Sequence, residues 1–303
     1  MQRYGFMATD VMTIAAPARV GGLRLSDTGV AWLMIAPAMI LMLVFYVYPI
    51  IQVLAISVAE PKPGLSNYTE LVESGSIQRV LLTTARTCAI TTALSVFLGY
   101  VVAYAMAAGS TPVQRWTLIA VVLPMWISAL VRAFAWVVLL RREGVINSVL
   151  QTTGITDHPL ALVWNEIGVV IGMVHYMLPY AILPLYANMR DIDRRCITAA
   201  RGLGASRTQA FRRIFLPLSL PGIVAASALV LVYSLGFFVI PAILGGGKTL
   251  MVAEYVRLQI SELLNWGRGT MLAVTLLVTV FTLLGSVIWL LGAKRLFGGG
   301  NNG

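Results

Sequence analysis

Residues 191–221 read DIDRRCITAARGLGASRTQAFRRIFLPLSLP, and this polar interval separates apolar runs that are long enough to cross a lipid bilayer. The apolar residues in its first half recur at helical spacing and predict one small, mostly alanine face. That face consists of Ile192, Cys196, Ala199, Ala200 and Leu203. Arg194 and Arg201 are expected to point away from it. The stretch therefore begins with a helix.

A turn and a second helix are expected to follow. Gly202 and Gly204 permit backbone angles that a side chain disfavours. Ser206, followed three residues later by Gln209, has the form of a capping box that opens a helix. We expect the resulting helix-turn-helix to be closed by two prolines, Pro217 and Pro221.

These residues resemble the EAA loop in the membrane subunits of bacterial ABC importers. The likeness rests on Ala199-Ala200, on Gly204 and on Ile214-Phe215-Leu216-Pro217, whereas Thr198 stands where the family has Glu. In that family the loop is a coupling helix that docks on a cytoplasmic ATPase subunit. The resemblance therefore implies a coupling role for Thr198, Ala199, Ala200, Arg201, Leu203, Gly204 and Ala205.

Composition excludes an ordinary soluble globule. Of the 303 residues, 58% are hydrophobic and 11% are charged, whereas soluble domains carry about 25% charged residues. The formal net charge of +10 would suit nucleic acid, but no platform of basic and aromatic residues accompanies it. We therefore expect an all-α integral membrane protein that contacts lipid and has no nucleic-acid partner.

Six apolar segments are each about 20 residues long, which is the length that crosses the hydrocarbon core. We expect spans at 30–56, 85–108, 116–140, 166–188, 221–244 and 269–293, which together form one transmembrane domain over 30–293. Prolines interrupt most of these segments. Kinks are expected there, because neighbouring helices can satisfy the carbonyls that a proline frees. The short apolar run within 1–29 does not have the form of a cleavable signal peptide.

The basic residues indicate the orientation of the spans. With the amino terminus in the cytoplasm, thirteen Lys and Arg residues fall on the cytoplasmic side, seven fall outside, and Arg86 and Arg132 lie within spans. The positive-inside rule then places both terminal tails, 1–29 and 294–303, and the coupling loop 189–220 in the cytoplasm. The outer loops are 59–84, 141–165 and 245–268.

Each outer loop is expected to contain a short helix. The first should be irregular before an amphipathic helix, and residues 145–150 should be helical in the second. The third loop predicts an amphipathic helix that either gates the outer mouth or fills space between spans. Its apolar face would carry Leu250, Ala253, Val256, Ile260, Leu263 and Leu264. Its polar face would carry Glu254, Arg257 and Glu262.

Arg132 is an exception within an apolar span. An arginine near mid-span costs about 2.5–3.5 kcal/mol on insertion scales, so it should face protein or a water-filled cavity. Either Arg132 lines a solute path with Trp126 and Trp136, or it latches helices together by pairing with backbone carbonyls at helix breaks. Arg86 lies nearer the outer end of its span and can snorkel.

Two further stretches are similar to the spermidine/putrescine branch of ABC permeases. They are LVRAFAW at 130–136, which leads to GVIN at 144–147, and YSLGFFVIPAILGG at 233–246. The resemblance implies the type I, MetI-like permease fold and a polyamine-type solute. Gly236 and Pro241 allow a helix break, and the aromatic faces beside it offer surfaces for an amine. The expected path residues are Trp126, Arg132, Trp136, His175, Tyr233, Phe237 and Phe238.

The sequence predicts no catalytic, metal or nucleotide site. Gly247-Lys248-Thr249 is not a phosphate-binding loop, because position 242 is Ala242 and a membrane span precedes it. No nucleophile-base set and no cluster of metal ligands is present, which argues against a membrane enzyme. Cys88 and Cys196 are expected to be inert.

These expectations combine into one membrane subunit of an ATP-driven importer. The resemblance implies a second homologous permease subunit, a dimer of ATP-binding subunits that carry ATP and Mg, and a periplasmic binding protein. The alternative is a secondary carrier energised by a proton gradient, with His175 as its intramembrane coupling group. The lack of Asp and Glu deep within the expected spans counts against that alternative.

Overall fold

The computed structural model describes residues 27–291, and it describes side chains from 31 to 289. Helices joined by turns and loops make up this range, which contains no strand. Most of the expected tails, 1–29 and 294–303, lies outside the described residues. The chain divides into two compact units, 1–50 and 51–303, which we describe separately.

The first unit supplies most of one membrane-length helix. It contains α1 (Asp27–Met42) and the π-helical segment η1 (Leu43–Val47), which runs on into α2 (Tyr48–Ala59). Pro37 lies inside α1 without ending it. The apolar run 31–59 has the length and hydropathy of a span, in agreement with the predicted span at 30–56. Its side chains are almost all exposed in the isolated chain, as lipid-facing residues would be.

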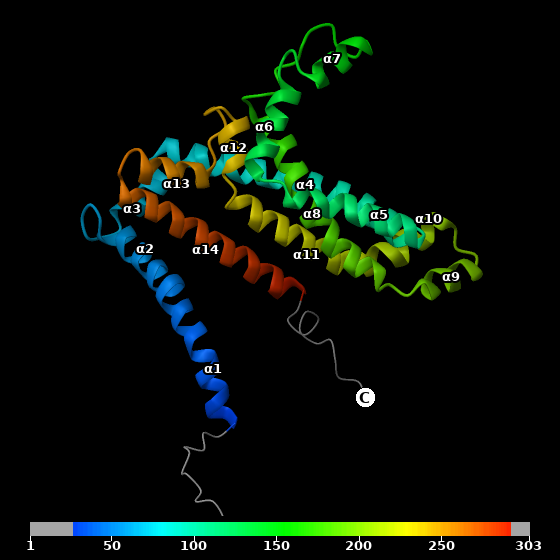
Figure 1. Cartoon of the computed structure of the whole chain (residues 1–303), viewed down its shortest axis with the longest axis horizontal. Helices are drawn as coiled ribbons and strands as arrows, with labels where there is room; N and C mark the ends of the chain where they lie inside the picture. The colour runs from blue at the N-terminus through cyan, green and yellow to red at the C-terminus, as the bar shows by residue number, and fades with distance from the viewer. Residues whose placement is uncertain (1–26, 292–303) are drawn as a thin grey trace, which may run out of the picture. The chain divides into compact units, whose positions relative to one another are not determined.

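The second unit is built on four further helices of membrane length (Figure 1). They are α4 (Gly75–Ala108), α8 (Glu166–Arg190), α11 (Leu216–Leu235) and α14 (Trp266–Leu291). The described residues therefore contain five helices long enough to span, or six if one bent pair counts as a span. This result confirms the fold class.

The predicted third span, 116–140, is not one continuous helix. It consists of α5 (Thr111–Val122), the 3-10 turn η2 (Leu123–Trp126) and α6 (Ala129–Leu140). The segments on either side of the break are bent by 101°. Pro124 lies in the 3-10 turn and Ile127 is extended, with ψ 134°. Because Pro124 supplies no amide hydrogen to the carbonyl four residues earlier, the α-helical pattern ends at Val122 and a 3-10 turn follows it.

The predicted fifth span, 221–244, was misplaced by about four turns at its start. The helical run begins at α10 (Arg207–Ala210), passes through the π-helical segment η3 (Phe211–Phe215) and continues as α11 to Leu235. Residues 239–244 form a separate helix, α12 (Val239–Leu244), after a break at Gly236. The break that the sequence predicted at Gly236 is therefore present, but it ends the span.

Pro217 and Pro221 do not close the coupling hairpin, contrary to the prediction. Pro217 occupies the first turn of α11, where its missing amide is tolerated, and Pro221 lies inside that helix. The amide of Leu216 donates to the carbonyl of Phe211, five residues back. The helical run therefore passes through a π-helical turn directly before Pro217.

The centre of the second unit is the contact among α4, α8 and α11 (Figure 1). Small residues allow close approach of the backbones. A Cβ on Gly99 would lie 3.0 Å from Cβ of Ala181, and one on Gly222 would lie 2.8 Å from Cβ of Asn188. Small-residue contacts of this kind are typical of helices that pack in membranes, where dispersion replaces the hydrophobic effect. α8 is the central helix, and Met173, Met177 and Leu185 on it are fully buried.

The expected outer-loop helices are present. They are α3 (Ser66–Glu73), α7 (Val145–Thr152) and α13 (Val252–Ser261). A bidentate ion pair joins α3 to α14, in which Nε of Arg268 lies 2.6 Å from Oε2 of Glu70 and Nη2 lies 2.9 Å from Oε1. The buried Asn147 side chain donates to the carbonyls of Arg141 and Leu160 and accepts from the Leu160 amide, so one side chain fixes the second loop.

The predicted faces of the third-loop helix were correct for Val256, Ile260, Arg257 and Glu262 but wrong for three residues. The Glu254 side chain is only 7% exposed, whereas Leu263 and Leu264 lie beyond the end of α13 and are exposed. Burial raises the pKa of the Glu254 carboxyl, and the Arg257 guanidinium partly opposes that shift. The helix starts two residues later than the pattern suggested, and it packs on α14 through Val256 and on α4 through its first turn. Packing on two partners overrides the simple amphipathic pattern.

Candidate coupling site and translocation path

The coupling hairpin has the helix-turn-helix form that the sequence predicts. It begins with α9 (Arg194–Gly202), where the Asp193 carboxylate accepts a hydrogen bond from the amide of Arg195 at 2.8 Å. Gly204 has φ +92°, a conformation that favours glycine. Ser206 and Gln209 form both bonds of the capping box, at 3.2 and 2.9 Å. Gly202, by contrast, is the last helical residue and does not have a positive φ.

α9 has two distinct faces, and Arg194 and Arg201 point away from the exposed Ala199 and Leu203, as predicted. Arg194, Ile197, Thr198 and Arg201 share one face, and they line a cavity against α4 and η3. Most of the predicted alanine face is turned outward, since Cys196 and Ala199 are exposed and Leu203 is 90% exposed, whereas Ile192 lines the cavity. Of the predicted coupling residues, only Ala200 and Ala205 are partly buried. The outward alanine and leucine surface is therefore free to contact another protein.

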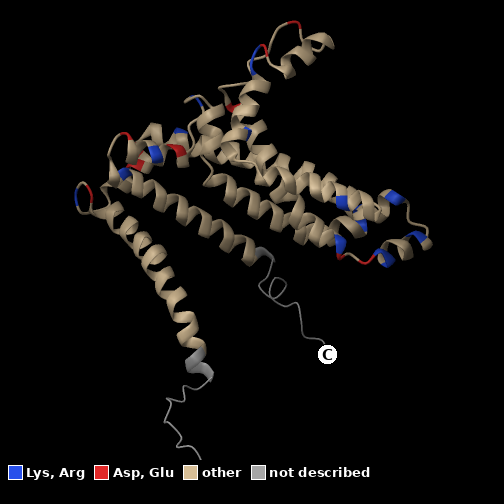
Figure 2. Cartoon of the chain, in the orientation of Figure 1, with Lys and Arg blue, Asp and Glu red and all other residues tan. Residues whose placement is uncertain are grey.

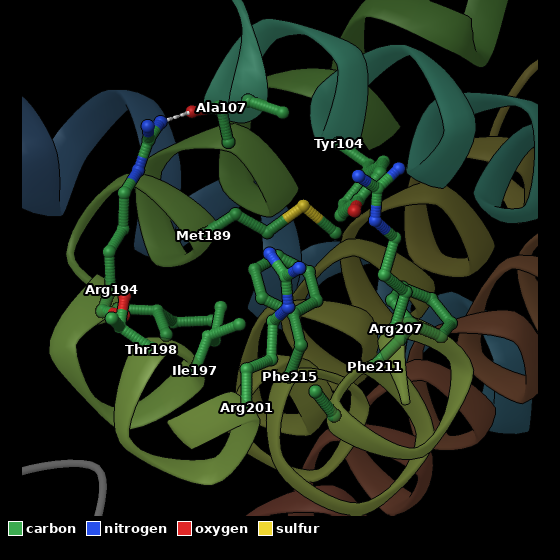
Figure 3. A pocket seen from close by; sticks show the side chains of 13 residues that line it. Tyr104, Ala107, Met189, Arg194, Ile197, Thr198, Arg201, Arg207, Phe211 and Phe215 are labelled. Atoms are coloured by element: carbon green, nitrogen blue, oxygen red, sulfur yellow. Dashed lines mark hydrogen bonds between the residues drawn. The ribbon is translucent and has the colours of Figure 1, made fainter. Parts of the chain in front are cut away.

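The cavity behind α9 has a volume of about 330 Å³ (Figure 3). One wall is aromatic: the Tyr104 ring meets Phe211 at 5.5 Å and Phe215 at 5.2 Å edge-on, while Phe211 and Phe215 stack at 5.8 Å. Aliphatic side chains of Met189, Ile192 and Ile197 and the guanidinium groups of Arg194, Arg201 and Arg207 complete the lining. The Arg194 Nη2 donates to the carbonyl of Ala107, and this bond ties α9 to the end of α4.

A second cluster lies near the two helix breaks, where α6, α8 and α12 meet. Arg132 is 6% exposed, and its guanidinium carbon lies 4.0 Å above the centre of the Tyr176 ring. Its Nε and Nη1 atoms have no hydrogen-bond partner among the described residues. The expected latch to backbone carbonyls is therefore not the arrangement of these two atoms. A cation on an aromatic face is stabilised by the ring quadrupole.

Further aromatic rings extend this cluster from α8 to the end of α11. Tyr176 meets Phe237 at 4.4 Å, and Tyr180 stacks on Tyr233 at 4.8 Å. The sequence interpretation missed Tyr176 and Tyr180. A signal was present, since Tyr176 and Tyr180 are four residues apart in one span and therefore share a helical face.

The remaining predicted path residues divide into two groups. Trp136 Nε1 donates to Nδ1 of His175 at 3.2 Å, and the two rings meet edge-on at 5.4 Å. Nδ1 of His175 is therefore an acceptor in a packed pair. Trp126, in the 3-10 turn, is 88% exposed, and Phe238 in the second break is also exposed. The structure thus brings five of the seven residues into neighbouring contacts, whereas Trp126 and Phe238 make no ring contact within the described residues.

Arg86, the other arginine expected within a span, is mostly exposed, and its Nη2 lies 3.0 Å from Oε2 of Glu166. Oε1 of Glu166 accepts from the Thr87 hydroxyl at 3.5 Å. The carboxylate at the start of α8 is therefore paired with α4. Because the arginine is largely exposed, we assign this pair a positioning role rather than a large contribution to stability.

Comparison with known proteins agrees with this architecture. Residues 95–297 match the family described as binding-protein-dependent transport system inner membrane component. The chain is 32% identical over 220 residues to the spermidine/putrescine transport system permease protein PotB of Escherichia coli (strain K12), covering 73% of this chain and 80% of that protein. Against PotB of Haemophilus influenzae the identity is 34%, covering 73% and 77%.

A solved structure shares the fold. It is a bacterial alginate ABC transporter in complex with an alginate pentasaccharide-bound periplasmic protein, with a TM-score of 0.69 and 18% identity over 88% of this chain and 94% of that chain. The matched proteins are permeases rather than enzymes. The helical fold, the membrane-length segments and the sequence match together show that this chain belongs to the family of inner-membrane permease components of binding-protein-dependent ABC importers.

Proposed function

We propose that this chain forms half of the translocation path of an ATP-driven importer and couples to separate ATPase subunits through residues 189–220. The observation that carries this proposal is the hairpin itself. It projects beyond the joined ends of α8 and α11 (Figure 1) and presents an outward surface of alanine and leucine. A second homologous permease would complete the path. ATP and Mg would bind to the ATPase dimer, and this chain would hold no cofactor.

The proposed orientation places the hairpin and both termini in the cytoplasm. Basic side chains gather around α9 and α10, whereas α3 and α13 at the opposite end of the unit carry charges of both signs (Figure 2). Seven arginines lie within residues 189–220, and they are Arg190, Arg194, Arg195, Arg201, Arg207, Arg212 and Arg213. An excess of arginine on one side of the membrane marks the cytoplasmic side.

We propose a polyamine-type solute, delivered by a periplasmic binding protein. Support comes from the PotB relatives and from the aromatic cluster of Tyr176, Tyr180, Tyr233 and Phe237. Aromatic faces attract amines. The charge of Arg132 would oppose a cation, but this guanidinium already lies on the Tyr176 face. The faces of Tyr180 and Tyr233 are therefore the better candidates for contact with the solute.

The two helix breaks would act as hinges during transport. ATPase closure would move the hairpin as a lever, and α8 and α11, which are directly connected to it, would tilt with it. The breaks at Ile127-Ser128 and at Gly236 lie where α12 contacts α6 and α8. Tilting at these breaks would open the path alternately to each side.

Reconstitution of the chain in vesicles tests the proposal. The chain alone should accumulate no solute. Together with its partner permease, the ATPase and the binding protein, it should accumulate spermidine only when ATP is supplied. Uptake by the single chain driven by a proton gradient would instead support the secondary carrier, with His175 as its coupling group. The binding protein identifies the solute separately, because its unfolding temperature rises with the ligand that it binds.

A further inference from the structure

The cavity behind α9 combines an apolar wall with unneutralised positive charge. None of its thirteen lining residues, all of them within the described part of the chain, is Asp or Glu. The acidic side chains nearest in sequence are engaged elsewhere. Asp193 caps α9 at the amide of Arg195, and Asp191 lies 3.9 Å from Arg190. The exposed arginines of the cavity therefore have no acidic partner among the residues that line it.

The three arginines of the cavity, Arg194, Arg201 and Arg207, differ in their hydrogen bonds. Arg194 donates to the carbonyl of Ala107. No hydrogen bond or ion pair joins the guanidinium of Arg201 or Arg207 to any other residue that the structure describes. Figure 3 shows the Arg201 side chain reaching into the middle of the cavity, near Met189, and the Arg207 side chain extending towards Tyr104. Two free guanidinium groups are therefore available to one ligand.

The apolar part of the cavity narrows the class of ligand. Tyr104, Phe211 and Phe215 form a continuous aromatic surface, with Ile192, Ile197 and Met189 opposite. A small inorganic anion would leave this surface uncovered. A volume of about 330 Å³ lies at the lower end of the range for organic ligands, roughly 300–1,000 Å³. The ligand should therefore carry both an anionic group and an apolar chain.

We propose that this cavity binds an anionic phospholipid of the inner leaflet, with its phosphate against Arg201 and Arg207 and part of one acyl chain along the aromatic wall. The proposal rests on the proposed function, because it uses the cytoplasmic orientation of the hairpin. Basic pockets between helices at the cytoplasmic face are typical sites for anionic headgroups. A lipid in this position would brace α9 against the end of α4, beside the bond from Arg194 to Ala107.

Native mass spectrometry of the full-length chain in detergent tests the proposal. The chain would be mixed with equal amounts of phosphatidylglycerol and phosphatidylethanolamine, and retained lipid would be counted. We expect preferential retention of phosphatidylglycerol, weakened about 30-fold in the Arg201→Gln/Arg207→Gln double variant, since each arginine contributes about a factor of five. The matched control is Arg212→Gln/Arg213→Gln, because both arginines are exposed on the same hairpin but lie outside the cavity.

Two competitors separate lipid from soluble ligands. Inorganic phosphate and deacylated glycerophosphoglycerol carry the anion without the acyl chain, so at concentrations equal to that of the lipid they should displace little of it. Complete displacement by either one would assign the cavity to a soluble anion and overturn the proposal. Equal retention of both lipids, or an equal loss in the control variant, would overturn it as well.

Two separate measurements distinguish failure of this site from failure of the proposed function. Lipid retention is measured on the purified chain without ATPase. ATP-driven spermidine uptake is measured on the assembled transporter. Uptake without lipid preference would refute the lipid site alone, whereas lipid preference without ATP-driven uptake would refute the transport proposal alone. If the added ATPase subunit displaces the bound lipid, the cavity is an acceptor for an acidic protein side chain, and the lipid proposal fails.

Discussion

The coupling hairpin and the aromatic cluster around Arg132 are built in opposite ways. The hairpin is largely exposed, and its shape is set by local bonds, namely the Ser206 capping box and the Asp193 cap, while one bond from Arg194 to Ala107 ties it to α4. The cluster has a buried arginine among half-buried rings, and it joins residues that are distant in sequence, as in the contact of Arg132 with Tyr176 and the stacking of Tyr180 on Tyr233. Residue type and spacing therefore specify the hairpin, which we propose acts as a lever. Packing between helices specifies the cluster, which we propose lines the path. Four substitutions test this contrast.

The largest effect is expected at the turn of the hairpin. Gly204→Asp should reduce ATP-driven uptake about tenfold or more, because a side chain at φ +92° stores about 1–3 kcal/mol of strain and distorts the docking surface. Membrane insertion should be unchanged, since the hairpin lies outside the packed helices. Uptake in reconstituted vesicles and the amount of inserted protein are the measurements.

Gly202→Asp is the matched control for the turn. It adds the same charge two residues earlier, at a helical position where an added Cβ would meet nothing within 4 Å. The remaining cost of Gly202→Asp is that of an anion at the carboxyl end of α9, which destabilises the helix by about 0.3–1 kcal/mol. If both variants lose the same uptake, charge rather than turn geometry controls coupling, and the local description of the hairpin is wrong.

The second largest effect is expected on the stability of the chain, at the contact between α8 and α12. Gly172→Ala would bring a Cβ to 2.5 Å from Cδ1 of Leu244 and 2.8 Å from Cγ2 of Ile240. Overpacking of this kind costs about 1–3 kcal/mol. Thermal unfolding of the purified chain should show a lower midpoint. Gly285→Ala, in α14, has open space and should be neutral or slightly stabilising. Equal midpoints would show that the α12 contact contributes little.

Substitution of Arg132 tests whether the aromatic cluster takes part in transport. Arg132→Gln removes the contact with the Tyr176 ring, which is worth about 0.5–2 kcal/mol. We expect uptake to fall about fivefold while copurification with the partner subunits is retained. Tyr176→Phe keeps the aromatic face and should retain most of the uptake. A parallel loss of uptake and copurification in Arg132→Gln would make Arg132 a structural residue that holds the helices together.

The smallest effect is expected at the capping box. Ser206→Ala removes the bond to the Gln209 amide and should destabilise the start of α10 by about 1 kcal/mol. Hydrogen exchange at α10 should rise, whereas uptake should fall about twofold or less. Thr208→Ala is the control, since this exposed side chain makes no hydrogen bond within the described residues. Faster exchange throughout α11 would contradict a purely local cap.

Sequence reasoning predicted the parts that obey local rules. The capping box, the glycine at Gly204 and the break at Gly236 all follow from residue type and spacing, and the structure contains each of them. Sequence reasoning failed where contacts between helices determine the structure. Glu254 is buried although its helix reads as amphipathic, and Pro217 and Pro221 continue a helix that they were expected to end. A π-helical turn directly precedes Pro217, and no sequence pattern signals that turn.

The sequence by itself determined the class of protein, the approximate spans and the hairpin, because hydrophobic length, arginine placement and turn chemistry act over short distances along the chain. Only the tertiary structure decided which face of α9 turns inward, which aromatic rings meet Arg132, and where the third span bends by 101°. These features depend on contacts between α4, α8, α11 and α12, whose residues are far apart in sequence. In an almost uniformly apolar chain, hydrophobicity does not distinguish one helix face from another, so close packing makes that choice.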